Sequence, residues 1–205
     1  MPASVQQIEF YFDFPSPYSY LANTQLPKLA AEHGVSIAYR PFRILEAMKI
    51  VGNRPTTLES PAKGRYAQLD VRRWAKRYGA PLQANPKLRS FDFPLLDRLV
   101  LVANEEGRAA ACVGAIFPAV WANADDLTDK AVLAQRLDAA GLPGAAMIEK
   151  AGGSGYAAQL EETTAKAAER GVFGAPTVFV GDDMFFGNDR LDFVAEALTA
   201  AKKAA

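Results

Sequence analysis

The chain has 205 residues, half of them hydrophobic, which is enough for one domain, or one domain with a large insertion, around a full core. Lys and Arg number 23, as do Asp and Glu, so no excess charge points to nucleic acid or an anionic membrane. The N-terminal residues lack a signal-peptide core and no stretch is apolar for long enough to span a bilayer. We therefore expect a soluble cytoplasmic protein.

The single cysteine and the single histidine narrow the chemistry further. Cys112 has no cysteine partner for an intrachain disulfide or a zinc cluster, and its apolar helical surroundings predict a buried, unreactive thiol. His33 precedes Gly34 at the end of a helical pattern, which is more typical of a surface cap than of a catalytic base. We expect neither a metal site nor a cysteine or histidine nucleophile system.

The chain opens with a strand followed by a helix. Residues 8–14 alternate with four large apolar side chains on one face, which predicts a strand. Residues 17–32 read as a helix, with Ser16 as its N-cap and Pro17 at its first position.

The helix and the segment after it complete a β-α-β unit. Pro27 lacks a backbone donor, so we expect a kink or a restart near Thr24. Gly34 ends the helix, and residues 35–42 form a second predicted strand.

Helical patterns dominate from residue 44 to residue 171. The predicted helices cover residues 62–78, 93–106, 109–123, 130–140 and 156–170. Strand signals return at 177–180 and 184–186, and a last helix runs from Arg190 to about Lys202. The order β-α-β, helical block, β-β-α predicts an α/β thioredoxin-like fold of residues 1–43 and 172–205, split by an all-helical insertion of residues 44–171.

The tetrapeptide Ser16-Pro17-Tyr18-Ser19 stands at the strand-to-helix junction where thioredoxin-like redox proteins carry Cys-x-x-Cys. Serine hydroxyls cannot exchange disulfides, so this site has no redox chemistry of its own. Its position at a helix N-terminus still favours the binding of an anion. A hydrogen bond to a charged group contributes about 1.5–3 kcal/mol, enough to lower the pKa of a bound thiol by roughly one to two units. The motif predicts a site for the thiolate of another molecule, with glutathione as the candidate; the alternative is an ordinary Ser-Pro helix start.

Two later segments contain candidate binding residues. In thioredoxin-like folds a proline at the position of Pro176 is cis and faces the active-site helix, and the backbone of the preceding residue, here Ala175, pairs with an extended peptide such as glutathione. A loop entering an edge strand is the alternative. Gly187-Asn188-Asp189 is a helix-capping sequence that is also suited to the carboxylate and ammonium of a γ-glutamyl group.

The helical block offers weaker signals. Read in isolation, Lys49 is a surface charge, Asn53 and Arg54 belong to one turn, and Asn85 belongs to another. Its aromatic positions favour core packing over a ligand site: Tyr66, Trp74 and Tyr78.

Five separated motifs together resemble one family over nearly the whole chain. They are Phe-Tyr-Phe-Asp-Phe-Pro-Ser-Pro-Tyr-Ser-Tyr-Leu-Ala at 10–22, Gly-Asn-Arg-Pro at 52–55, the helix at 61–75, Val-Phe-Gly-Ala-Pro-Thr at 172–177 and Phe-Gly-Asn-Asp-Arg-Leu at 186–191. They resemble the 2-hydroxychromene-2-carboxylate isomerases, relatives of kappa-class glutathione transferases and of DsbA-like oxidoreductases. The segment 85–95 departs from the pattern of that family's substrate pocket.

The resemblance implies a glutathione-dependent isomerase of aromatic degradation, a homodimer in relatives, that interconverts 2-hydroxychromene-2-carboxylate and trans-o-hydroxybenzylidenepyruvate or a close analogue. It implies that Ser16 activates the glutathione thiol and that Ala175, beside Pro176, binds the glutathione backbone. The γ-glutamyl part would lie against residues Phe186, Gly187, Asn188 and Asp189. The substrate would lie near Lys49, Asn53, Arg54 and Asn85.

Three alternatives remain open. A glutathione transferase would use the same bound thiolate and release a conjugate. A disulfide oxidoreductase is nearly excluded by Ser16 and Ser19. A binding module that lost its chemistry together with its cysteines would show no turnover.

Overall fold

The protein is described by a computed structural model that covers residues 5–204, apart from the side chains at positions 56, 58 and 204. Its sheet has the order β2-β1-β3-β4, with β1 parallel to β2 and antiparallel to β3, and β3 antiparallel to β4. The strands are β1 (Gln7–Phe12), β2 (Ser36–Pro41), β3 (Thr177–Val180) and β4 (Asp183–Phe186). The four predicted strands are thereby confirmed, and the fold is the predicted thioredoxin-like α/β arrangement.

Strand β1 is buried on both faces. Phe10, Phe12 and the other apolar residues of the predicted alternation are fully buried in the larger hydrophobic cluster. Tyr11 lies in a second cluster, where its ring meets those of Phe42 and Phe179 edge-on. On this second face Tyr11 is buried, Glu9 is half-buried and Gln7 at the start of the strand is exposed, so the strand is covered on both sides toward its C-terminal end.

Helix α1 (Pro17–His33) runs unbroken through Pro27, so the predicted restart near Thr24 is wrong. Proline removes one backbone hydrogen bond, but Leu26 is fully buried and its packing holds the helix against the sheet. The helix ends as predicted at Gly34, whose positive φ of 70° is a conformation that glycine adopts without a steric cost.

No strand occurs between residues 44 and 171, all of which lie in the described part of the chain, and the five predicted helices are confirmed to within two residues. Three short helices were not predicted because none is longer than eight residues, too short for a clear periodic pattern: α2 (Ile44–Ile50), α3 (Thr56–Glu59) and α8 (Gly144–Ala151). The others are α4 (Pro61–Tyr78), α5 (Phe93–Glu105), α6 (Ala109–Trp121), α7 (Lys130–Ala139), α9 (Ser154–Glu169) and the 3₁₀ turn η1 (Leu88–Ser90).

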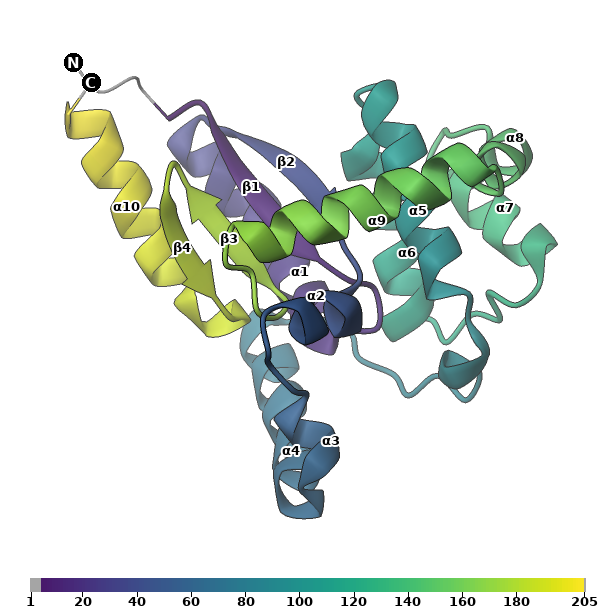
Figure 1. Ribbon diagram of the computed structural model, residues 1–205, viewed down its shortest axis with the longest axis horizontal. Helices are drawn as coiled ribbons and strands as arrows, with labels where there is room; N and C mark the ends of the chain where they lie inside the picture. The colour runs from purple at the N-terminus through teal and green to yellow at the C-terminus, as the bar shows by residue number, and fades with distance from the viewer. Residues whose placement is uncertain (1–4, 205) are drawn as a thin grey trace.

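The C-terminal segment adds the 3₁₀ turn η2 (Asn188–Arg190) and helix α10 (Leu191–Ala204). Figure 1 shows α5 to α8 gathered beyond the β2 edge of the sheet, α10 beside β4, and α3 with α4 projecting away from the rest. None of the helices within residues 5–204 is long and apolar enough to cross a membrane.

The sheet and the helical block share one hydrophobic cluster. Phe117 from α6 is fully buried and contacts Phe12 and Phe14, with ring centroids 5.5 and 4.7 Å apart. The division of the chain into a thioredoxin-like domain and a separate inserted domain stays a prediction.

Candidate functional site

Ser16 caps the start of α1 and faces the loop that precedes β3. Its Oγ accepts a hydrogen bond from the backbone N–H of Ser19 at 3.1 Å and donates one to the carbonyl of Ala175 at 3.3 Å. Its own N–H donates to the carbonyl of Asp13 at 3.1 Å. The fold therefore brings together the serine and the alanine that the sequence singled out 159 residues apart.

The two serines of the tetrapeptide differ in accessibility. Ser19 is fully buried, and within the described residues its hydroxyl has no hydrogen-bond partner. Ser16 keeps 9% of its surface exposed. Its bond to Ala175 is long for an O–H···O hydrogen bond, which is commonly about 2.7–2.8 Å. The Ser16 hydroxyl can therefore turn toward a stronger acceptor with little loss.

The peptide bond between Ala175 and Pro176 is cis, as expected. Two other predicted residues hold this loop. The amide Nδ2 of Asn53 donates to the carbonyl of Phe173 at 2.8 Å, and the N–H of Gly187 donates to the carbonyl of Pro176 at 2.9 Å. Ser16, Asn53, the cis-proline loop and the end of β4 thus form one connected cluster.

Gly187 follows β4 in a conformation that requires glycine. Its φ is 107°, and a Cβ there would lie 2.4 Å from a carboxylate oxygen of Asp189. Gly174 lets the ring of Phe186 approach the backbone closely, because a Cβ there would lie 2.7 Å from that ring. That ring also packs on Phe173 with centroids 4.6 Å apart and remains 42% exposed.

Asn188 is buried, and its backbone carbonyl accepts a 2.6 Å hydrogen bond from the hydroxyl of Tyr78. Its side-chain Nδ2 is shielded from solvent and has no partner among the described residues. Asp189 makes a partly exposed ion pair with Arg190 at 2.5 Å. Asn188 and Asp189 border a cavity of about 350 Å³ together with Trp74 and Tyr78.

The aromatic residues of α4 divide into two groups. Trp74 and Tyr78 pack against the core, as predicted. Tyr66 is 60% exposed, so its predicted core position is wrong. Only the C-terminal half of α4 is buried, because the N-terminal half belongs to the projecting arm in Figure 1.

The remaining predicted substrate residues are placed differently. Lys49 and Arg54 are exposed and make surface ion pairs with Glu46 and Glu59 at 3.1 and 3.8 Å. Asn85 is buried, and its amide bonds the backbone of the helical block, with Nδ2 2.9 Å from the Asp125 carbonyl. The structure does not bring Asn85 into the Ser16 cluster, because these bonds hold its amide between two loops of that block.

Tyr18 was not predicted as a site residue, although it lies inside the tetrapeptide. Its hydroxyl donates to the carboxylate of Asp70 on α4 at 3.0 Å. Burial, followed by this carboxylate, raises the pKa of Tyr18 above its usual value, so the phenol stays protonated. A groove of about 450 Å³ beside it is lined by Tyr18, Thr57, Ala62, Lys63, Tyr66 and Ala67. The family resemblance included the α4 segment 61–75 that lines this groove, but it assigned no role to a residue of that segment.

A buried pair of carboxyl groups behind Ser16 was also missed. Asp13 and Asp97 are 5% and 1% exposed, and they lie close enough for each carboxyl to shift the pKa of the other. Burial raises the pKa of Asp13 to about 7, and burial together with Asp13 raises the pKa of Asp97 well above its usual value. The only sequence signal was an acidic residue inside the apolar run Phe12-Asp13-Phe14.

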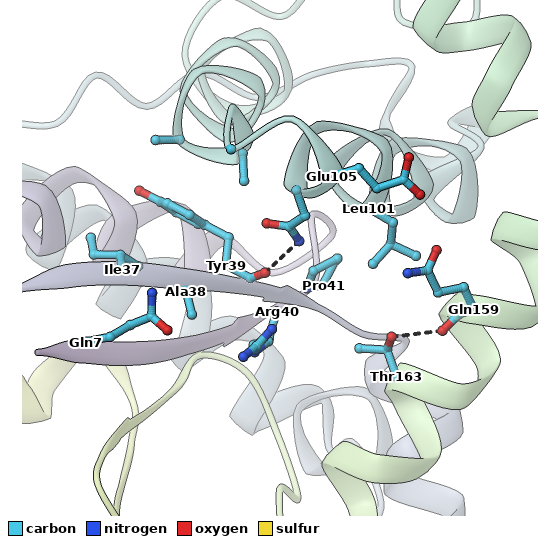
Figure 2. A pocket seen from close by; sticks show the side chains of 14 residues that line it. Gln7, Ile37, Ala38, Tyr39, Arg40, Pro41, Leu101, Glu105, Gln159 and Thr163 are labelled. Atoms are coloured by element: carbon cyan, nitrogen blue, oxygen red, sulfur yellow. Dashed lines mark hydrogen bonds between the residues drawn. The ribbon is translucent and has the colours of Figure 1, made fainter.

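A larger cavity of about 590 Å³ lies at the outer edge of β2 and contains none of the predicted site residues (Figure 2). There Asn104 donates its amide to the carbonyl of Tyr39 at 3.0 Å, and Pro41 has no N–H to offer. Its lining comes from β2 and the neighbouring helices and includes no residue of the Ser16 cluster, so we do not place the site in it.

Cys112 is fully buried, as predicted, and burial raises the pKa of its thiol to about 12. Within residues 5–204 the structure shows no cluster of His, Cys, Asp or Glu residues that would hold a metal ion.

We expect Cys112 of the folded protein to resist a soluble thiol reagent at about pH 8, with a rate at least a hundredfold below that of a free thiol. Addition of denaturant should restore stoichiometric labelling, which a chromogenic disulfide reagent measures. Rapid labelling of the native protein would contradict the buried placement of this residue.

Residues 7–199 match the family model of the DSBA-like thioredoxin domain. The chain is 37% identical over 192 residues to a 2-hydroxychromene-2-carboxylate isomerase of Sphingobium xenophagum, covering 93% of this chain and 97% of that protein. The chain belongs to this isomerase branch of the DSBA-like thioredoxin family.

A solved structure of a 2-hydroxychromene-2-carboxylate isomerase matches with a TM-score of 0.87 and 32% identity, covering 97% of both chains. The glutathione S-transferase kappa 1 of Caenorhabditis elegans is 30% identical over 205 residues, covering 94% of this chain and 90% of that protein. The resemblance read from the motifs is thereby confirmed, and the family relation supports an isomerase.

Proposed function

We propose that this protein is a glutathione-dependent isomerase that interconverts 2-hydroxychromene-2-carboxylate and trans-o-hydroxybenzylidenepyruvate, or a close aryl-pyruvate analogue, in the degradation of aromatic compounds. One observation carries the proposal. The hydroxyl of Ser16, at the start of α1, faces the cis Ala175-Pro176 loop in a chain that aligns over almost its full length with isomerases of this name.

The residues present suit the three parts of glutathione. The weakly held hydroxyl of Ser16 suits the sulfur, and the backbone at Ala175 suits the peptide. The unpartnered, buried Nδ2 of Asn188 suits the γ-glutamyl carboxylate. The carboxylate of Asp189 suits the ammonium, because its exposed ion pair with Arg190 contributes little and can be exchanged.

When bound, glutathione supplies a thiolate that adds reversibly to a conjugated carbon–carbon double bond, leaves it rotatable, and departs as the double bond re-forms, so that no oxidant or reductant is consumed. The role of Ser16 is to hold this sulfur in its charged form. Its hydroxyl turns from the carbonyl of Ala175 and donates to the thiolate, next to the positive end of the α1 dipole.

Other residues of the chain would orient the substrate. Lys49 and Arg54 are exposed cations whose surface ion pairs leave them available to a carboxylate. Asn53 is fixed by its bond to Phe173 and lies beside the cis-proline loop. The groove beside Tyr18 is the apolar surface that would accept the aromatic ring.

We expect the purified protein to interconvert the two named compounds only when glutathione is present, with glutathione recovered unchanged. Chromatography of the reaction mixture measures both the isomer ratio and the thiol. Turnover at the same rate without glutathione would contradict the cofactor, and the absence of turnover with bound glutathione would favour a binding module.

A transferase is the second candidate, because the kappa-class relative spans almost the entire chain. It would consume the same bound thiolate and form a stable thioether with an electrophilic aryl halide. Accumulation of that conjugate, without isomerisation of the aryl pyruvate, would decide for the transferase.

A cytoplasmic homodimer remains part of the proposal. Large apolar side chains are exposed on α2 and α4, and such patches commonly mark interfaces. They are Leu45, Ile50, Tyr66 and Leu69. Sedimentation of the purified protein measures the mass of the assembly.

A further inference from the structure

The carboxyl pair behind Ser16 links three segments of the chain. Asp13 lies in the turn between β1 and α1, and its carbonyl accepts the N–H of Ser16 at 3.1 Å. Its side-chain Oδ2 accepts the N–H of Ile44, the first residue of α2, at 2.9 Å. Asp97, which contacts it, belongs to α5 of the helical block. One buried contact therefore holds the Ser16 turn, α2 and α5 together.

Two negative charges cannot coexist at this position. Each carboxyl has an Oδ1 atom that is shielded from solvent and meets no donor among the described residues. Desolvation and mutual repulsion both disfavour a doubly charged pair, whereas one proton shared by the two groups removes the repulsion and supplies a donor.

The nearby cations do not neutralise the pair by direct contact. Arg43 and Arg98 act on it only through their fields. The guanidinium of Arg43 lies 4.0 Å from the carboxylate of Glu46, and that of Arg98 lies 3.9 Å from the carboxylate of Asp92. A shared proton is therefore the remaining way to satisfy the two buried groups.

We propose that Asp13 and Asp97 are positioning residues of the site, and that a proton shared between them holds the Ser16 turn against α2 and α5. The effect on glutathione rests on the function proposed above, whereas the effect on the turn does not.

The turn and α2 reach the same loop from two directions. Ser16 donates to the carbonyl of Ala175, and Asn53, which follows α2, donates to the carbonyl of Phe173. Asp13 accepts hydrogen bonds from the N–H groups of Ser16, in the turn, and of Ile44, at the start of α2. Separation of the carboxyl pair would move the Ser16 hydroxyl relative to the cis-proline loop.

The protein contains its own reporter of this turn. The indole N–H of Trp121 donates to the carbonyl of Phe14, the residue after Asp13, at 2.9 Å. The chain has two tryptophans, so a Trp74→Phe variant leaves Trp121 as the single tryptophan, which is excited selectively above the tyrosine absorption band.

The test follows Trp121 fluorescence against pH in the Trp74→Phe protein, alone and combined with Asp97→Asn. Asp138→Asn is the matched control, because Asp138 also accepts a backbone N–H, that of Gly144 at 2.8 Å, at the start of α8. We expect a transition near pH 7 in the parent and in the control. That transition is the loss of the first of the two protons, which leaves one proton shared by the pair. The shared proton is lost at a higher pH, because burial and the charge of Asp13 raise the pKa of Asp97 well above its usual value. Asp97→Asn has no second proton to lose, so the higher transition should be present in the parent and in the control and absent in Asp97→Asn. The same higher transition in Asp97→Asn, or no transition in the parent, would overturn the proposal.

A second arm measures glutathione affinity by titration. Asp97→Leu, which keeps the branched shape and has no donor, should weaken binding about tenfold, whereas Asp97→Asn should stay within about twofold of wild type. Equal affinity of the Leu and wild-type proteins would overturn the positioning role. If wild type binds no glutathione, the proposed function fails, and the fluorescence arm still decides the fate of the carboxyl pair.

Discussion

Ser16→Ala is expected to lower kcat/KM for glutathione by about 10- to 150-fold. The hydroxyl is the one side-chain donor at the helix start that combines partial exposure with a weak existing bond. A hydrogen bond to a charged group contributes about 1.5–3 kcal/mol, and each 1.4 kcal/mol corresponds to a factor of ten. Steady-state rates of isomerisation at varied glutathione concentration measure the loss.

Two matched variants separate chemistry from capping. Ser19→Ala removes a buried hydroxyl without a partner and should leave the rate within about twofold of wild type. Ser60 caps α4, where its Oγ accepts the N–H of Lys63. Ser60→Ala should therefore lower the free energy of unfolding by about 1 kcal/mol, which shows what the loss of a helix cap away from the site does by itself. If Ser16→Ala and Ser19→Ala had the same activity, Ser16 would be only a helix cap.

Phe117→Ala is expected to lower the free energy of unfolding by about 3–5 kcal/mol. The ring is fully buried and packs on Phe12 and Phe14. Because Phe117 belongs to α6 and its partners to the β1 segment, the variant opens a cavity where the helical block meets the sheet. Denaturant unfolding followed by fluorescence and circular dichroism should show one transition at a lower midpoint with an unchanged slope.

Phe193→Ala is the matched control, because this phenylalanine of α10 is 47% exposed. Its removal should change the free energy of unfolding by less than about 0.5 kcal/mol. Two separate transitions in wild type, with only one of them moved by Phe117→Ala, would show that the helical block unfolds independently of the sheet.

The sequence predicted the parts of the fold that depend on local pattern. Alternation in residues 8–14 identified β1 because a strand repeats every two residues. Ser16 and Gly34 identified both ends of α1 because capping needs a side-chain acceptor at one end and a left-handed residue at the other. The cis-proline loop was expected only once the whole β-α-β and β-β-α order was known.

The sequence could not predict contacts that depend on how distant segments dock. Asp13 and Asp97 come close because α5 packs against the sheet at β2, and nothing near either residue in the sequence indicates its partner. The bond between Tyr18 and Asp70 likewise depends on where α4 crosses α1. Asn85 looked like a pocket residue, but its amide closes a loop, because a buried amide bonds whatever backbone lies nearest.

The central claim is that this site holds glutathione as a thiolate beside Ser16. Its most direct test is the ultraviolet absorbance of the thiolate, titrated against pH with glutathione bound to wild type and to Ser16→Ala. The account predicts a thiol pKa in wild type roughly one to two units below that of free glutathione, and a smaller shift, or none, in the variant. Bound glutathione with an unshifted pKa in wild type, or an equal shift in both proteins, would contradict it.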